Sequence, residues 1–283
     1  DGRLWAVNPE AGFFGVLPGT SHQTNPTAFD MIQRDTIFTN AALRPDGTPW
    51  WEGHDDPPPS EALDWQGRPW TPDSPEKATH PNARFTTPAV NCVSLSPEFD
   101  NPNGVPLDAI MFGARRQRRV PLVYESKNWQ HGVFLGATLS SETTAAASGK
   151  TGVLRRDPMA MLAFCGYNMG DYFQHWLDVA RNLPSPPRIF RVNWFRTDAR
   201  GKFIWPGFGE NLRVVKWIFE RCDGTGQGRE TPIGIVPTPE AIDRTGLTLS
   251  DEAMQALVTV EAGDWAEASA DQATFFGSLG PRV

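Results

Sequence analysis

The amino-acid sequence predicts a mixed α/β fold, and three features of its hydrophobic pattern support that prediction. A short strand, a polar loop, a short helix and a second strand follow one another within residues 1–45. Short apolar runs spaced by turns, as in a meandering or mixed sheet, occupy residues 105–156. Helix patterns and one further strand follow in residues 157–283. We therefore expect a mixed β-sheet core with flanking helices.

The first strands are predicted at residues 13–17 and 36–43, with a short helix around residues 28–34 between them. Residues 46–90 combine a triple proline, paired tryptophans and Asp-Gly turns without helical periodicity, which predicts irregular structure with short hairpins. The sheet region that follows contains four β-type runs, at residues 107–112, 120–124, 132–139 and 152–154.

The last third of the chain is predicted to be mainly helical. Asp157 followed by Pro158 is a typical helix start, so we expect a buried helix over residues 159–182. The elements expected after it are a strand at 188–195, an amphipathic helix at 209–221, and two acidic helices that begin at Ser250 and near Asp264.

The composition excludes several classes of protein. With 39% hydrophobic and 11% aromatic residues among 283, the chain is not intrinsically disordered, and no apolar run is long enough for a membrane span. A net charge of −7 argues against nucleic acid as a partner. The three cysteines are odd in number and far apart, which favours free thiols in a reducing compartment. We therefore expect a cytoplasmic protein with no membrane partner.

Most common motifs of catalysis and metal binding are missing from the sequence. The glycine loop at residues 15–21 lacks the lysine of a Walker A motif, and the Gly-Lys-Thr at 149–151 has Thr144 where that motif needs its first glycine. The five histidines are isolated, so a metal site within the chain is not predicted. No G-x-S-x-G motif occurs, which argues against a nucleophilic triad.

Three segments do suggest a ligand. Four arginines within residues 115–119 follow a predicted strand, and they indicate either an anion site or a solvated basic turn. Residues 194–208 hold an aromatic cluster that is core by default, but two glycines flank Phe208 and Asn211 follows closely. An exposed ring beside an amide suits a planar base with hydrogen-bonding edges. The small and polar residues at 140–151 indicate either a mobile segment or an ordinary surface loop.

Six motifs, in the same order over about 200 residues, resemble the C-terminal half of GTP-dependent phosphoenolpyruvate carboxykinase. They are Phe13-Phe14-Gly15-Val16 with Pro18-Gly19-Thr20-Ser21, His80-Pro81-Asn82-Ala83-Arg84-Phe85, Phe112-Gly113-Ala114-Arg115-Arg116, Trp129-Gln130-His131-Gly132-Val133-Phe134, Ser141-Glu142-Thr143-Thr144-Ala145-Ala146-Ala147, and Asn193-Trp194-Phe195-Arg196 with Phe208-Gly209-Glu210-Asn211.

The resemblance implies the reversible conversion of oxaloacetate and GTP into phosphoenolpyruvate, GDP and carbon dioxide. It implies that Arg84 is catalytic and contacts the transferring phosphoryl group, that Asn82, Ala83 and Arg84 bind the small acid, and that Arg115 binds nucleotide phosphates. The base would lie between Phe195 and Phe208. The full set of implied GTP-binding residues is Arg84, Arg115, Trp194, Phe195, Phe203, Phe208, Gly209, Glu210 and Asn211, and the implied lid is Ser141, Glu142, Thr143, Thr144, Ala145, Ala146 and Ala147.

The same resemblance implies a fragment. The family's P-loop, its reactive cysteine and its Mn²⁺ ligands would lie before Asp1, and Mg²⁺ would accompany the nucleotide. The chain would be the C-terminal lobe, made of a sheet remnant (1–45), an irregular segment with the Asn-x-Arg motif (46–104), a sheet with the lid at about 140–150 (105–156), the guanine pocket (157–223) and C-terminal helices (224–283). The full protein is expected as a monomer with one Mn²⁺. This chain alone is predicted to be inactive, and the alternative is a non-catalytic nucleotide-binding or interaction module.

Overall fold

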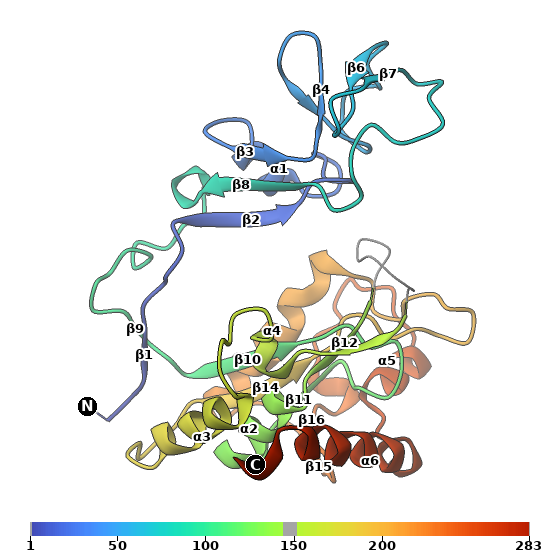
Figure 1. Cartoon of the computed structure of the whole chain (residues 1–283). Helices are drawn as coiled ribbons and strands as arrows, with labels where there is room; N and C mark the ends of the chain where they lie inside the picture. The colour runs from blue at the N-terminus through green and yellow to red at the C-terminus, as the bar shows by residue number, and fades with distance from the viewer. Residues whose placement is uncertain (1, 144–151, 283) are drawn as a thin grey trace. The chain divides into compact units, whose positions relative to one another are not determined.

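The computed structural model describes residues 2–143 and 152–282, which divide into two compact units (Figure 1). Residues 6–105 form the N-terminal unit, and residues 2–5, 106–143 and 152–282 form the C-terminal unit. The chain passes between the units at strands β1 (Trp5–Ala6) and β9 (Val105–Pro106), which pair with each other. Within the described ranges, no helix combines the length and apolar composition that a membrane span requires.

Two small antiparallel sheets make up the N-terminal unit. One has the strand order β2-β8-β3, and the other has the order β5-β4-β6-β7. The second sheet consists of two-residue strands, which confirms the short hairpins predicted for residues 46–90. The elements are β2 (Gly12–Val16), α1 (Pro26–Met31), β3 (Ile37–Thr39), β4 (Ala42–Leu43), β5 (Pro49–Trp50), β6 (Ala62–Leu63), β7 (Pro69–Trp70), β8 (Arg84–Pro88) and the 3₁₀ turn η1 (Ala89–Asn91).

The strands of this unit are short, and its two cores are built around tryptophan side chains. Trp51 is buried, stacks on Phe38 at 5.9 Å between ring centroids, and donates its indole N–H to the carbonyl of Thr20 at 2.7 Å. Trp50 and Trp70 stack at 5.7 Å in the second core. Large rings therefore bury enough surface to fix loops that have almost no regular structure.

A five-stranded mixed sheet of order β10-β14-β11-β16-β15 forms the centre of the C-terminal unit. Strands β10 and β14 run parallel, and the other neighbours are antiparallel. This sheet with its helices confirms the predicted α/β fold class. The elements are β10 (Ala109–Gly113), β11 (Val123–Glu125), α2 (Trp129–Ala137), β12 (Ser140–Glu142), β13 (Leu154–Arg156), η2 (Pro158–Ala160), α3 (Met169–Ala180), β14 (Arg188–Val192), η3 (Phe208–Glu210), α4 (Asn211–Cys222), β15 (Arg229–Thr231), β16 (Gly234–Val236), η4 (Pro239–Ala241), α5 (Asp251–Val258), α6 (Ala262–Ser278) and η5 (Gly280–Arg282).

Helices cover both faces of this sheet (Figure 1). Phe190 and Val192 of β14 belong to the core shared with α4 and α5, whereas Ile189 belongs to the core shared with α2 and α3. Phe276 of α6 packs at the edge of the second core, 6.0 Å from Phe134 of α2. Strand β14 is therefore buried on both faces, with Arg188 as its one exposed residue.

A buried ion cluster joins three elements of the unit. Glu125 at the end of β11 is 4% exposed, and its two carboxylate oxygens accept from Arg188 of β14 and Arg221 of α4, each at 2.6 Å. Both oxygens of the buried carboxylate are thus paired with a cation. Removal of either arginine would leave part of a buried negative charge uncompensated.

Two predicted elements are wrong. Residues 132–139 were expected as a strand but lie mainly in helix α2, because the side chain of Asn128 accepts the backbone N–H of His131 at 2.8 Å and caps a helix there. The helix expected from residue 159 begins only at Met169, capped by Asn168. Met159 has φ +55°, a conformation that breaks a helix at that point.

Helix α2 lies directly on β14 through Gly132. A Cβ at this position would lie 2.4 Å from Cδ1 of Ile189, so substitution forces the helix and strand apart. We expect Gly132→Ala to lower the free energy of unfolding by about 2 kcal/mol, measured by urea denaturation. Gly277→Ala in α6 is the matched control: nothing lies within 4 Å of its added Cβ, so it should be neutral or stabilising by up to about 1 kcal/mol. Equal effects of the two changes would contradict the close approach.

Candidate functional site

The Asn-x-Arg motif lies in the N-terminal unit, at the start of β8. Arg84 is the first residue of that strand and pairs with Val16 and Thr39 on its two neighbours. Its Nε and Nη2 donate to Oδ1 of Asn82 at 3.0 and 2.6 Å, and its guanidinium carbon lies 5.2 Å from the ring centroid of Phe14. The guanidinium is therefore oriented by a neighbour two residues away before any ligand binds.

Ala83, between these two residues, has no side-chain atoms to offer a ligand because it is fully buried in the core beside Leu17. Its backbone N–H donates to the carbonyl of His80 at 2.9 Å, and its carbonyl accepts from Leu17 N–H at 2.9 Å. The backbone of Ala83 therefore holds the turn on which Asn82 and Arg84 lie.

The predicted aromatic cluster lies in the C-terminal unit, between the end of β14 and the start of α4. Phe195 and Phe203 meet edge to face at 5.8 Å. Phe203 is 54% exposed and Phe208 is 79% exposed, which is unusual for large rings. Gly207, at φ +119°, provides the backbone turn that places Phe208 outside the core, and among the described residues Phe208 makes no ring contact.

Asn211 has a fixed amide beside this cluster. Trp205, buried at 1% exposure, donates its indole N–H to Oδ1 of Asn211 at 2.9 Å. Because the oxygen of the amide is held by the indole, the NH₂ group lies on the opposite side of the amide. Asn211 can therefore present a hydrogen-bond donor away from Trp205.

The remaining cluster residues have supporting positions. Trp194 is partly buried and packs against the core of α4 and α5. Gly209 is exposed in the turn η3, and Glu210 forms an ion pair with Nε of Arg213 at 2.5 Å. Helix α4 starts at Asn211, two residues later than predicted, because η3 occupies the preceding positions.

Arg115 connects the aromatic cluster to strand β12. Its guanidinium carbon lies 4.8 Å from the ring centroid of Phe195, its Nη1 donates to the carbonyl of Glu142 at 3.2 Å, and its backbone N–H donates to Oγ of Ser141 at 3.1 Å. Thr143 of the predicted lid follows this strand, and Thr144, Ala145, Ala146 and Ala147 lie outside the described residues.

Asn193 is a residue whose role sequence reasoning missed. It is 1% exposed; its Nδ2 donates to the carbonyls of Arg116 and Val120 at 2.8 and 2.9 Å, and its Oδ1 accepts from the backbone N–H groups of Arg116 and Phe195 at 3.1 and 3.2 Å. These four bonds hold the loop of residues 116–120 and the backbone of Phe195 at the end of β14. The sequence signal was its place at the head of the motif Asn193-Trp194-Phe195-Arg196, which does not reveal what its side chain binds.

Comparison with known proteins gives a consistent result over the whole chain. The family model described as the C-terminal P-loop domain of phosphoenolpyruvate carboxykinase matches residues 1–283. The chain is 55% identical over 280 residues to "Phosphoenolpyruvate carboxykinase [GTP]" of Anaeromyxobacter dehalogenans (strain 2CP-C), covering 99% of this chain and 47% of that relative. It is 56% identical to the enzyme of that name from Chlamydia muridarum (100% and 48% covered) and 54% identical to that of Renibacterium salmoninarum (94% and 44%). The chain thus spans about half the length of the curated relatives it matches.

Asn193→Asp tests the four-bond arrangement. The carboxylate keeps the shape of the amide but would face two carbonyl oxygens that it cannot bind, so we expect the free energy of unfolding to fall by about 3 kcal/mol. Chemical denaturation measures this. Asn182→Asp, at an exposed position of the same unit, should change it by less than about 0.5 kcal/mol. An equally small effect at residue 193 would show that the amide does not hold the loop.

Proposed function

The chain belongs to the GTP-dependent phosphoenolpyruvate carboxykinase family, and we propose that the whole protein reversibly converts oxaloacetate and GTP into phosphoenolpyruvate, GDP and carbon dioxide. The observation that carries this proposal is the exposed ring of Phe208, three residues before the oriented amide of Asn211. Within this protein, the chain would contribute the guanine pocket and two arginines. The cytoplasmic location and the monomeric state expected above stay predictions.

Guanine selection would follow from the orientation of Asn211. Guanine presents an acceptor oxygen at the position where adenine presents an amino donor. The NH₂ group of Asn211, facing away from Trp205, can donate to that oxygen and would meet an amino group unfavourably. The base would stack against Phe208, which lies exposed next to this amide in the sequence.

Arg115 would change partners when the nucleotide binds. In the structure its guanidinium covers one face of Phe195. A base that stacks on Phe195 must therefore use the other face or take the place of the guanidinium. In the second case Arg115 becomes available to the nucleotide phosphates, to which the guanidinium can donate two parallel hydrogen bonds.

Arg84 would act on the transferring phosphoryl group. Phosphoryl transfer depends on positioning and on stabilising charge that spreads over the phosphoryl oxygens. Asn82 already holds two guanidinium nitrogens of Arg84, so little reorganisation would accompany the reaction. Asn82 itself would help to hold the small acid.

The metal ions belong to the whole protein in this proposal. Across residues 2–143 and 152–282 there is no group of three or more His, Cys, Asp or Glu side chains placed to hold a metal ion. These residues thus offer no such group for Mn²⁺, and Mg²⁺ would be held mainly by the nucleotide phosphates, so we derive no step through either ion. The chain alone should not turn over, since phosphoryl transfer requires the metal and phosphate contacts together.

A non-catalytic nucleotide-binding module is the alternative. It shares the guanine pocket, and it differs in having no turnover when the whole protein is supplied with oxaloacetate, GTP and Mn²⁺. Coupled formation of phosphoenolpyruvate and GDP by the whole protein would support the enzyme, and GDP binding without product would favour the module.

Phe208→Ala should weaken GDP binding by about 1–3 kcal/mol, the contribution of one stacked base. Isothermal titration with GDP measures the change. Phe164→Ala is the matched control, because Phe164 is another exposed phenylalanine, 78% accessible, between η2 and α3 and outside the cluster. Unchanged GDP affinity in Phe208→Ala would remove this ring from the pocket.

Arg84→Ala in the whole protein should lower kcat at least about 100-fold while it changes GDP affinity much less. Steady-state kinetics and GDP titration separate the two effects. Arg34→Ala is the control, because Arg34 also donates to an asparagine side chain in the N-terminal unit, at 3.1 Å from Nε to Oδ1 of Asn91, but belongs to no predicted site. A loss of GDP affinity with normal turnover would exclude Arg84 from the chemistry.

A further inference from the structure

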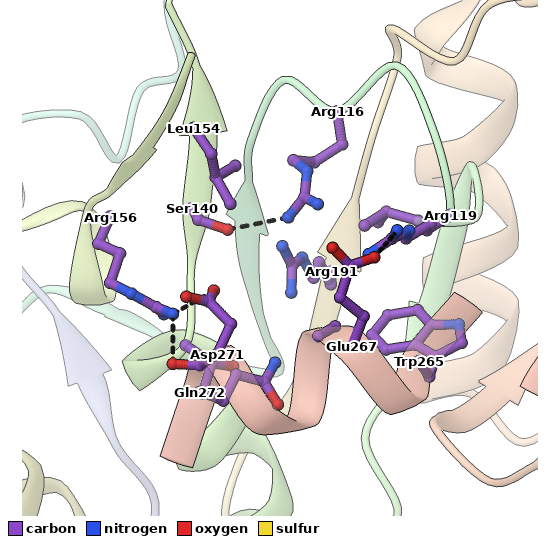
Figure 2. A pocket seen from close by; sticks show the side chains of 13 residues that line it. Arg116, Arg119, Ser140, Leu154, Arg156, Arg191, Trp265, Glu267, Asp271 and Gln272 are labelled. Atoms are coloured by element: carbon purple, nitrogen blue, oxygen red, sulfur yellow. Dashed lines mark hydrogen bonds and ion pairs between the residues drawn. The ribbon is translucent and has the colours of Figure 1, made fainter. Parts of the chain in front are cut away.

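The C-terminal unit has a cavity, separate from the aromatic cluster, whose lining is rich in arginine. It has a volume of about 360 Å³, within the range of small-molecule sites, and it lies between the β12–β13 hairpin, β14 and helix α6 (Figure 2). We call it the arginine pocket. Its principal lining residues are Arg116, Arg119, Arg156, Arg191, Ser140 and Trp265. None of them belongs to the aromatic cluster.

Two of these arginines are neutralised by helix α6. Arg119 forms an ion pair with Glu267, and Arg156 forms one with Asp271. The carboxylates are 76% and 54% exposed, and exposed ion pairs of this kind contribute little to stability. The two pairs thus orient α6 at the pocket without holding it tightly.

The other two arginines have no such close pairing with α6. Arg116 donates from Nη1 to Oγ of Ser140 at 2.9 Å, and its Nε lies 3.8 Å from the carboxylate of Glu142, an ion pair too long for a hydrogen bond. Arg191, in the middle of β14, is 2% exposed and belongs to no ion pair within the described parts of the chain. Figure 2 shows its guanidinium directed into the cavity, between Arg116 and Glu267.

Three buried N–H donors of the two arginines lack a protein acceptor among the described residues. They are Nε and Nη2 of Arg191 and Nε of Arg116. Burial and the neighbouring charge of Arg191 also lower the pKa of Arg116, against the opposite effect of Glu142. A buried cation without a partner is costly, so the lining needs an acceptor that carries negative charge.

We propose that the arginine pocket binds the phosphate group of a small molecule, held by Arg191 and Arg116. The donors come from a loop and a strand, and so approach from different directions. A tetrahedral phosphate offers oxygens in all these directions, whereas a carboxylate offers two in one plane. This proposal is independent of a nucleotide at the aromatic cluster.

The test is isothermal titration calorimetry of the protein with inorganic phosphate at constant ionic strength. Arg191→Met should bind phosphate at least tenfold more weakly than the unchanged chain, which corresponds to about 1.4 kcal/mol. Arg191→Lys keeps the charge but not the planar fork and should lie between the two. Arg200→Met removes one positive charge from an exposed turn outside the pocket and should bind phosphate normally.

Thermal unfolding gives a second readout in the same samples. Without phosphate, Arg191→Met should unfold at a higher temperature than the unchanged chain, because a buried unpaired charge is replaced by an apolar side chain. Phosphate should raise the unfolding temperature of the unchanged chain and of Arg200→Met but not that of Arg191→Met. GDP affinity should be the same in all of them, which separates this site from the guanine pocket.

Three results would overturn the proposal. Equal phosphate affinity in Arg191→Met and the unchanged chain would place the anion elsewhere. Binding of acetate or malonate that depends on Arg191, without binding of phosphate, would make the pocket a carboxylate site. The absence of any Arg191-dependent anion binding, with a lower unfolding temperature for Arg191→Met, would mean that water alone solvates these donors.

Discussion

The side-chain amide of Asn193 is the contact on which both sites of the C-terminal unit depend. Its NH₂ group has two donors and its oxygen has two lone pairs, and all four are used in bonds to the backbone. The NH₂ group donates to the carbonyls of Arg116 and Val120, and the oxygen accepts from the backbone N–H groups of Arg116 and Phe195, so one amide fixes both the arginine-bearing loop and Phe195. Aspartate lacks the donors, and glutamine has a longer side chain. The position therefore tolerates few replacements, although it touches no proposed ligand.

Strand β14, which ends at the residue before Asn193, packs into both helix-covered cores of the unit. Alternate residues of the strand face two different helical layers, and Arg191 lies on the same face as Ile189. Gly132 brings α2 against that face with no space for a further carbon. The arginine pocket is consequently built on a strand that cannot easily move, which suits a site that must hold charges in fixed positions.

Local signals explain what could be predicted from the sequence. Ser250 caps α5 as expected, with its Oγ accepting the N–H of Ala253 at 3.2 Å, and turn residues marked the hairpins of residues 46–90. The aromatic cluster was found because Phe208 stands between two glycines. Helix α2 was missed because its apolar residues, buried against two layers, lack a polar face and so resemble a buried strand. Part of the arginine pocket has a local signal, because Arg116 and Arg119 belong to the run of four arginines at residues 115–119. Arg156 and Arg191 have none, since only the fold brings the hairpin, the strand and helix α6 to that loop.

Arg115 has a further consequence that follows from its contacts. The residue is bonded at the same time to the ring of Phe195 and to the two residues at the end of β12, Ser141 and Glu142. A ligand that draws the guanidinium away from Phe195 must also alter the carbonyl bond to Glu142. Where ligand binding breaks this bond, thermodynamic reciprocity requires that a change which stabilises the bond weakens binding of the ligand. Affinity for a nucleotide phosphate can therefore be tuned from the hairpin, by residues that never meet the nucleotide.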